Sequence, residues 1–164
     1  MRLPTRKSEK QNLQPVDLHI TREKYDELTA LRERLKKARP KLADEVKRLA
    51  EMGDFSENAA YQIAKGRLRG LNRRLDETEY LLNHAVIIKH QNGGAAQLGH
   101  TVTVEVNGKQ KTYQILGSSE TDPARGIISH NSPLGAALLG KRVGERVRVP
   151  LNNKTVAYTI VNII

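Results

Sequence analysis

Apolar residues recur at heptad spacing through the first half of the chain. One leucine stripe repeats every seven residues, at Leu28, Leu35, Leu42 and Leu49. Together with the apolar row that interleaves with it, this stripe predicts an amphipathic helix that packs against a partner. Thr21 suits the N-cap of this helix, and Gly53 suits its end. Pro40 interrupts the pattern, so we expect a kink or a joint there.

A second heptad stripe begins within a few residues of the first and runs through Tyr61, Leu68, Leu75 and Leu82. Neither helix is apolar enough to stand alone, so each is expected to bury its stripe on the other. The short connection between them requires the two helices to run antiparallel. We therefore predict a coiled-coil finger over residues 16–90, with two arms of about 30 residues and a length of roughly 45 Å.

The hydrophobic period changes to two after the glycine-containing stretch 91–96, which we interpret as a linker. Residues 101–106 alternate between apolar and polar, the Asn107-Gly108 pair is a strong hairpin signal, and residues 109–116 are expected to form the returning strand. Further strands are expected at Ile127-Ile128, 146–149 and 155–163.

One short helix interrupts these strands. Ser132 followed by Pro133 is typical of an N-cap and first helical position, and Gly140 is suited to end the helix. For residues 97–164 we predict a compact antiparallel sheet with this one helix. The whole chain is therefore expected to have an α+β fold.

Composition adds a class of partner. The chain carries 28 Lys and Arg against 18 Asp and Glu, a formal net charge of +10. Such a balance favours polyanionic partners, above all RNA or DNA. The absence of cysteine excludes disulfides and cysteine-type zinc sites. No apolar run has the length of a membrane span, so we expect a cytoplasmic protein. We also expect a monomer, with a basic disordered tail over residues 1–15.

The connection between the two helices carries two acids, Asp54 and Glu57, three positions apart. In one interpretation they form a capping box, with Asp54 as the N-cap and Glu57 as the N3 residue of the second helix. In the other, they are metal ligands on a rigid stalk. Mg²⁺ commonly takes one or two carboxylates together with water and substrate phosphates. The pair is therefore suited to complete a metal site whose other ligands come from another protein. The spacing leaves both interpretations open.

Two sequence blocks resemble the Gre family of transcript-cleavage factors. The first is the tip segment 53–59, Gly-Asp-Phe-Ser-Glu-Asn-Ala, followed by Tyr61. The second comprises 116–118, 128–134, 137–141 and 143–144, in the family's order. The resemblance implies a finger that enters the secondary channel of bacterial RNA polymerase and an FKBP-like docking domain over 97–164. It also implies a factor that is not itself an enzyme but stimulates the polymerase to cleave backtracked nascent RNA.

The same resemblance implies roles for particular residues. The tip acids, matching Asp54 and Glu57 within the tip 53–58, would help to hold a second Mg²⁺ of the polymerase active site, with no cofactor of the factor's own. The docking segment would contact the channel rim, with Asn131, Ser132 and Pro133 as the candidates. The partners implied are the polymerase and the 3′ end of the nascent RNA.

A run of like charges follows the tip on the second predicted helix: Lys65, Arg67, Arg69, Arg73 and Arg74. Three of them are spaced four apart and share one helix face. A solvated surface is the ordinary role of such charges, but unscreened like charges repel, and RNA phosphates would compensate them. We favour RNA contact. This stretch also resembles the GreB branch more than the GreA branch.

Three other functions stay open. A channel-occupying inhibitor would share the architecture without promoting cleavage. A prolyl isomerase would use the sheet domain, although that half offers two tyrosines and no Phe or Trp for an aromatic pocket. A free-standing RNA-binding coiled coil would bind RNA without polymerase, in a salt-sensitive manner.

The histidines give no metal motif in the sequence. None of the five pairs with another at ligand spacing on a clear element, and we interpret all of them as surface or docking residues: His19, His84, His90, His100 and His130.

Overall fold

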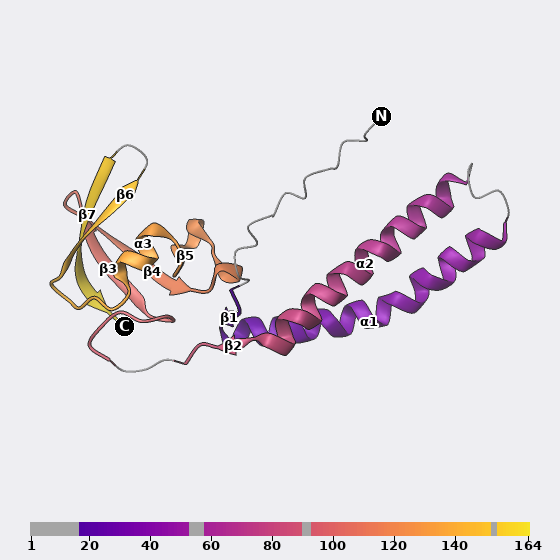
Figure 1. The fold of residues 1–164 in the computed structure, drawn as a ribbon, viewed down its shortest axis with the longest axis horizontal. Helices are drawn as coiled ribbons and strands as arrows, with labels where there is room; N and C mark the ends of the chain where they lie inside the picture. Colours follow the sequence, from indigo (N-terminus) through magenta and orange to yellow (C-terminus); the bar gives the residue numbers. More distant parts are fainter. Residues whose placement is uncertain (1–16, 53–57, 90–92, 152–153) are drawn as a thin grey trace, which may run out of the picture.

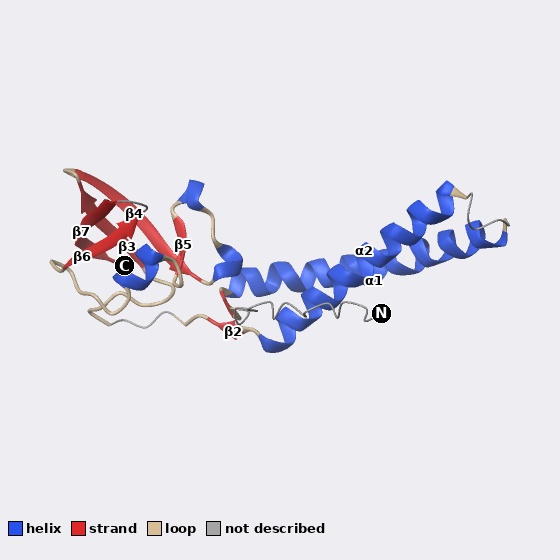
Figure 2. Cartoon of the chain, turned by 45° about the horizontal axis from the view of Figure 1, so that its top comes forward, coloured by secondary structure: helices blue, strands red, loops and turns tan. Residues whose placement is uncertain are grey.

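In the computed structural model, the described residues are 17–52, 58–89, 93–151 and 154–164. They form a two-helix finger and a sheet unit at its base (Figures 1 and 2). The predicted α+β class is confirmed. The expected tail over residues 1–15 lies outside the described residues.

The finger consists of α1 (Arg22–Glu51) and α2 (Ala59–His84), which run back along each other (Figure 1). The heptad stripes face the partner helix, and their most buried members are Leu28, Leu75 and Leu82. Thr21 is the N-cap of α1 as predicted, and its side chain accepts a hydrogen bond from the Lys24 backbone N–H at 3.2 Å. The stripe therefore specifies both the helices and their pairing.

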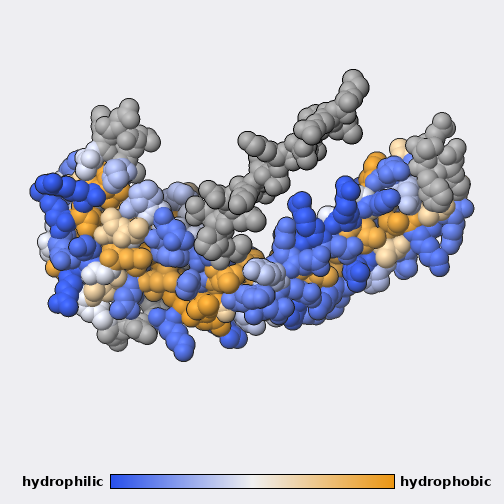
Figure 3. Space-filling model, in the orientation of Figure 1, coloured by the Kyte–Doolittle hydropathy of each residue, from blue (hydrophilic) through white to orange (hydrophobic). Residues whose placement is uncertain are grey.

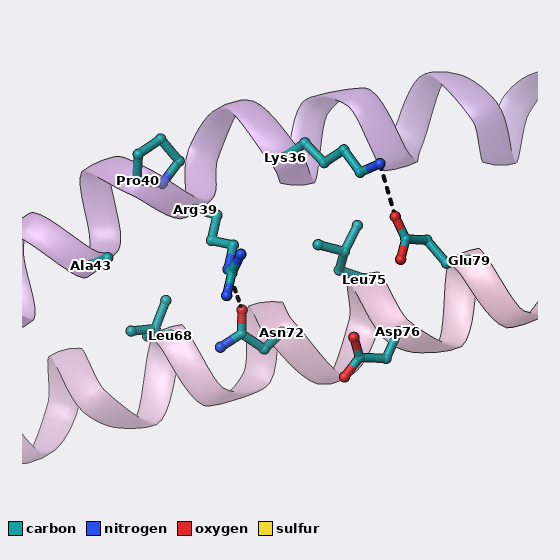
Figure 4. Close-up of a pocket in the computed structure, with 9 residues that line it drawn as sticks. All are labelled: Lys36, Arg39, Pro40, Ala43, Leu68, Asn72, Leu75, Asp76 and Glu79. Carbon is teal, nitrogen blue, oxygen red and sulfur yellow. Dashed lines mark hydrogen bonds and ion pairs between the residues drawn. The ribbon is translucent and has the colours of Figure 1, made fainter.

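Pro40 lies inside α1, and the helix continues through it, so it is not a joint between two helices. Beside it the helices border a groove of about 710 Å³ (Figure 4). Two polar contacts cross between the helices here. The Lys36 ammonium lies 2.9 Å from the Glu79 carboxylate, and Arg39 Nε donates to Asn72 Oδ1 at 3.0 Å. The hydrogen bond from Lys36 holds the pKa of Glu79 below its ordinary value.

The base of the finger is closed by two short strands, β1 (His19–Ile20) and β2 (Val86–Ile87), which pair in parallel. They join the residues that precede α1 to those that follow α2. Ile20 is almost fully buried and packs with Leu28 and Leu82. The two ends of the finger are thus fixed to each other below the helices.

The sheet unit contains five strands in the order β5-β4-β3-β7-β6. Their bounds are Thr101–Val106 for β3, Lys109–Leu116 for β4, Ile127–Ser129 for β5, Arg146–Leu151 for β6 and Lys154–Ile163 for β7. The prediction of an antiparallel sheet is wrong at one edge, because β5 pairs with β4 in parallel. Two 3₁₀ turns, η1 (Ser118–Glu120) and η2 (Pro123–Arg125), carry the chain back between these strands.

Local signals in this unit are confirmed. Asn107 and Gly108 have φ of 51° and 72° in the β3–β4 hairpin, the conformation that this pair favours. The helix α3 (Pro133–Leu138) has Ser132 as its N-cap, as predicted. Ala96, at the end of the predicted linker, is buried in the sheet core.

None of the described helices combines the length and apolar character needed to cross a membrane.

Candidate functional site

The two tip acids, Asp54 and Glu57, lie outside the described residues, but both ends of their connection are described. The N-cap of α2 is Asn58, whose Oδ1 accepts a hydrogen bond from the Tyr61 N–H at 3.0 Å. The capping-box interpretation of Asp54 and Glu57 is therefore wrong for α2, which begins at Ala59. The N-cap position of α2 is thus occupied by Asn58 and by neither acid.

Asn58 has a second role at the tip. Its Nδ2 donates to the Leu49 carbonyl oxygen in the last turn of α1 at 3.2 Å. One amide side chain therefore caps α2 and ties it to α1. This contact joins the first residue after the connection to the last turn of α1, so Asn58 holds the ends of the two helices together.

All five residues of the basic run are exposed on α2, from its first turns at Lys65 to just past its middle at Arg74. Figure 3 shows strongly hydrophilic residues along the α2 side of the finger. Arg73 lies 3.5 Å from Glu77, and the Lys65 ammonium lies 5.6 Å from the centroid of the Tyr61 ring. Within the described part of the chain, Arg67, Arg69 and Arg74 have no ion pair. Their charges are available to an external anion.

The predicted docking segment lies in the sheet unit, between β5 and α3. Asn131 and Pro133 are exposed. The Ser132 hydroxyl donates to the Ser129 carbonyl at 2.6 Å and accepts from the Gly135 N–H at 3.0 Å. Its hydrogen bonds are thus made within the segment. Ser132 holds the segment in shape, whereas Asn131 and Pro133 present surface.

Close packing beneath this segment adds to its rigidity. Gly135 is buried, and a Cβ at this position would collide with the Ser129 carbonyl oxygen. The Asn131 backbone N–H donates to Ser129 Oγ at 3.0 Å, and Ser129 Oγ lies 2.8 Å from Ser118 Oγ. A surface held in this way loses little conformational entropy when it binds a partner.

The structure also brings together three residues that sequence reasoning did not group. Asp17, His19 and His130 meet where β1 lies against the sheet unit. Asp17 Oδ1 lies 3.0 Å from His19 Nδ1, and Asp17 Oδ2 lies 3.3 Å from His130 Nδ1. No spacing signal reveals this cluster, because His130 reaches it only through the tertiary fold.

Asp17 is the centre of the cluster. Burial raises the pKa of its carboxyl, but hydrogen bonds from the Ser118 N–H and from His19 outweigh burial and hold that pKa below its ordinary value. The Ser118 N–H donates to Oδ2 at 2.6 Å. The carboxylate is therefore ionised at neutral pH, with its hydrogen bonds crossing from the base of the finger to the sheet unit.

Comparisons with known proteins cover nearly the whole described chain. The family model for the N-terminal part of transcription elongation factors matches residues 18–87, and the model for the C-terminal part of GreA/GreB matches residues 90–164. Transcription elongation factor GreA of Macrococcus caseolyticus is 41% identical over 138 residues, 82% of this chain and 87% of that protein. GreA of Roseiflexus castenholzii is 38% identical over 150 residues, 88% and 96% of the two chains.

Among solved structures, GreA factor homolog 1 of Thermus thermophilus aligns with a TM-score of 0.43 and 26% identity, covering 90% of this chain and 99% of that one. The two curated relatives are named GreA, so the prediction of the GreB branch is not supported. DNA binding likewise receives no specific support from these matches.

Proposed function

The chain belongs to the GreA/GreB family of transcription elongation factors, and we propose that it places the acidic tip of its finger in the active site of RNA polymerase. Members of this family stimulate the polymerase to cleave its own transcript and are not themselves nucleases. In this proposal the finger enters through the secondary channel, and the backtracked 3′ segment of the nascent RNA is cut there. The factor acts as a cytoplasmic monomer.

One observation carries the proposal: Asn58 caps α2, so neither Asp54 nor Glu57 is needed as its cap. Two carboxylates are too few for a dedicated Mg²⁺ site, but they suit a site shared with another protein's ligands. A Mg²⁺ ion held there would neutralise developing charge and activate the attacking water. In the same proposal, the two-helix finger brings both acids to the shared Mg²⁺ site.

The basic run supplies the RNA contact in this proposal. Arg67, Arg69 and Arg74 have no ion pair among the described residues, and all five basic side chains are exposed on α2, the helix that leads away from the tip. Single-stranded RNA presents one phosphate per nucleotide, and exposed Arg and Lys bind such a backbone without sequence preference. The run would hold the extruded RNA while the tip acids act.

The third element of the proposal is docking of residues 97–164 at the channel rim through Asn131, Ser132 and Pro133. The exposed Asn131 and Pro133 would contact the polymerase, and the internal hydrogen bonds of Ser132 would hold them in position. Residues 16–90 would then act as the inserted finger and 91–96 as the connection between the two units.

The test is transcript cleavage in a stalled, backtracked polymerase complex supplied with Mg²⁺. The parent chain should shorten the labelled RNA promptly, and the Asp54→Asn, Glu57→Gln variant should lose most of this stimulation while still competing with the parent for polymerase. The Asp44→Asn, Glu45→Gln variant on α1 changes the same two residue types and should cleave normally. Undiminished cleavage by the tip variant would contradict the proposal. Binding without cleavage by the parent would instead indicate a channel-occupying inhibitor.

A further inference from the structure

We propose that Asp17, His19 and His130 form a binding site for a divalent metal ion such as Zn²⁺, Co²⁺ or Ni²⁺. The site lies at the joint between the finger and the sheet unit. The site lies at the base of the finger, where α1 begins (Figure 1), and it shares no residue with the tip acids. It does not depend on the proposed function, because its ligands and its test involve neither polymerase nor RNA.

The spacing of the three ligand atoms is close to what a metal requires. One ligand atom from each residue lies within 4.8 Å of the other two. His19 Nδ1 is 3.0 Å from one Asp17 oxygen, Oδ1, and His130 Nδ1 is 3.3 Å from the other, Oδ2. In a tetrahedral zinc centre with bonds of about 2.0–2.1 Å, neighbouring ligand atoms are about 3.4 Å apart. Small side-chain rotations would bring the three atoms onto one ion.

The ligand types select the class of metal. Two imidazoles and one carboxylate suit zinc, cobalt or nickel, whereas Mg²⁺ and Ca²⁺ prefer oxygen ligands throughout. Three protein ligands leave a fourth position for water or for a group of a partner. The exposed fractions of the side chains, 44% for His19 and 20% for His130, give an ion access from solvent.

The carboxylate is already oriented by its surroundings. The Asp17 side chain is only 6% exposed, and it accepts hydrogen bonds from the backbone N–H of Ser118 at 2.6 Å and of His19 at 3.2 Å. Such outer contacts fix a metal ligand before the ion arrives. They also come from both sides of the joint, because His19 belongs to β1 and Ser118 to η1.

His130 can give up its present contacts at little cost. Its Nδ1 lies 3.4 Å from the Leu116 carbonyl oxygen, a long contact. That carbonyl accepts a shorter hydrogen bond, 2.9 Å, from the His130 backbone N–H. The Leu116 oxygen therefore keeps a donor when Nδ1 turns to a metal. The rings of His19 and His130 lie edge to face with centroids 5.6 Å apart, so the two imidazoles are already neighbours.

The experiment is a titration of the untagged full chain with Co²⁺, followed by its visible absorption, and then displacement of Co²⁺ by Zn²⁺. We expect one ion per chain, with the intense absorption of a four-coordinate site. The His19→Ala, His130→Ala variant should bind at least about a hundredfold more weakly, since loss of outer contacts alone typically costs 10–100-fold. His84→Ala removes a histidine outside the cluster and should bind like the parent.

Circular dichroism of each variant without metal establishes that it is folded. Because the double variant keeps Asp17 and its bond to Ser118, the joint should remain assembled. The Asp17→Asn variant tests the carboxylate ligand independently and should also weaken Co²⁺ binding. The proposal is overturned if the parent binds no Co²⁺ or Zn²⁺. Equal affinities for the parent and the folded double variant would overturn it as well, since they would mean adventitious binding only.

Discussion

The Glu120 carboxylate accepts two hydrogen bonds from Thr21, one from its backbone N–H at 2.8 Å and one from its hydroxyl at 2.5 Å. The two residues are 99 positions apart in the sequence. Thr21 is also the N-cap of α1, since its oxygen accepts the Lys24 N–H. The residue that starts the finger is thus held by the sheet unit.

Replacing Glu120 should loosen the joint. Hydrogen bonds to a charged group contribute about 1.5–3 kcal/mol each when protected and less when partly exposed. We therefore expect Glu120→Ala to lower the free energy of unfolding by about 1–3 kcal/mol in urea denaturation. Glu105→Ala, which removes an exposed carboxylate from the sheet, should change it by less than about 0.5 kcal/mol. Equal effects of the two variants would show that the Thr21 contact contributes nothing.

Two exposed glycines in α2 leave room for stabilisation. A Cβ at Gly66 or Gly70 would meet no atom within 4 Å, and neither residue has a positive φ. Glycine inside a helix is destabilising by roughly 0.5–1 kcal/mol relative to alanine. Each Gly→Ala variant should therefore raise the free energy of unfolding by about that amount, measured by thermal or urea denaturation.

A third glycine provides the opposite control. Gly135→Ala would place a Cβ against the Ser129 carbonyl oxygen, so this variant should destabilise the sheet unit. If Gly66→Ala and Gly70→Ala instead lowered the helical content, the helix around the basic run would require glycine there for a reason other than steric crowding.

The parts of the fold that sequence predicted well are those whose signals are local. The bounds of β3 and β4 agree with the predicted strands 101–106 and 109–116, and the hairpin between them follows from Asn107-Gly108. The Thr21 and Ser132 caps likewise need only the next three residues. Heptad spacing was sufficient for the pairing of α1 with α2, because each stripe has no other surface on which to bury itself.

The parts that sequence missed depend on contacts between distant segments. The parallel pairing of β5 follows from the path of the chain through η1 and η2. The sequence of this segment has no hydrophobic periodicity from which that path could be predicted. The Asp17 cluster exists because Asp17 meets Ser118, 101 positions later. Asn58 was overlooked as the α2 cap because Asp54 and Glu57 offered a capping box with the right spacing, and such a pattern fits more than one position.

The basic run should contribute to the salt dependence of RNA handling. Each phosphate contact contributes about 0.7 to the slope of log affinity against log salt concentration for a single strand. Changing Arg67, Arg69 and Arg74 to Gln should therefore reduce this slope by about 2, and should weaken crosslinking of the extruded RNA to the factor. The measurement is crosslinking in backtracked complexes at several KCl concentrations.

A control on α1 separates local contact from overall charge. Arg34, Lys37 and Lys41 are exposed on the other helix, and among the described residues they have no ion pair. Replacing these three by Gln lowers the net charge by the same amount. An equal change of slope in both triple variants would mean that net charge alone attracts RNA and that the run on α2 makes no special contact.

Asn58 should link the stability of α2 to the activity of the tip. Asn58→Ala removes the cap and the bond to Leu49, so it should lower the free energy of unfolding by about 1 kcal/mol. It should also reduce cleavage stimulation by about ten- to a hundredfold, because small displacements of catalytic groups have large effects on rate. Denaturation and the backtracked-complex assay measure the two effects separately.

A second substitution separates the two roles of Asn58. Asn58→Asp keeps an oxygen that can accept the Tyr61 N–H but loses the Nδ2 donor to the Leu49 carbonyl. Stability should therefore stay close to that of the parent while cleavage falls, because the ends of the tip connection are no longer tied together. Asn83→Ala, at an exposed position late in α2, should leave both unchanged. Full cleavage by Asn58→Asp would mean that the cap alone positions the tip acids and that the link to α1 is dispensable.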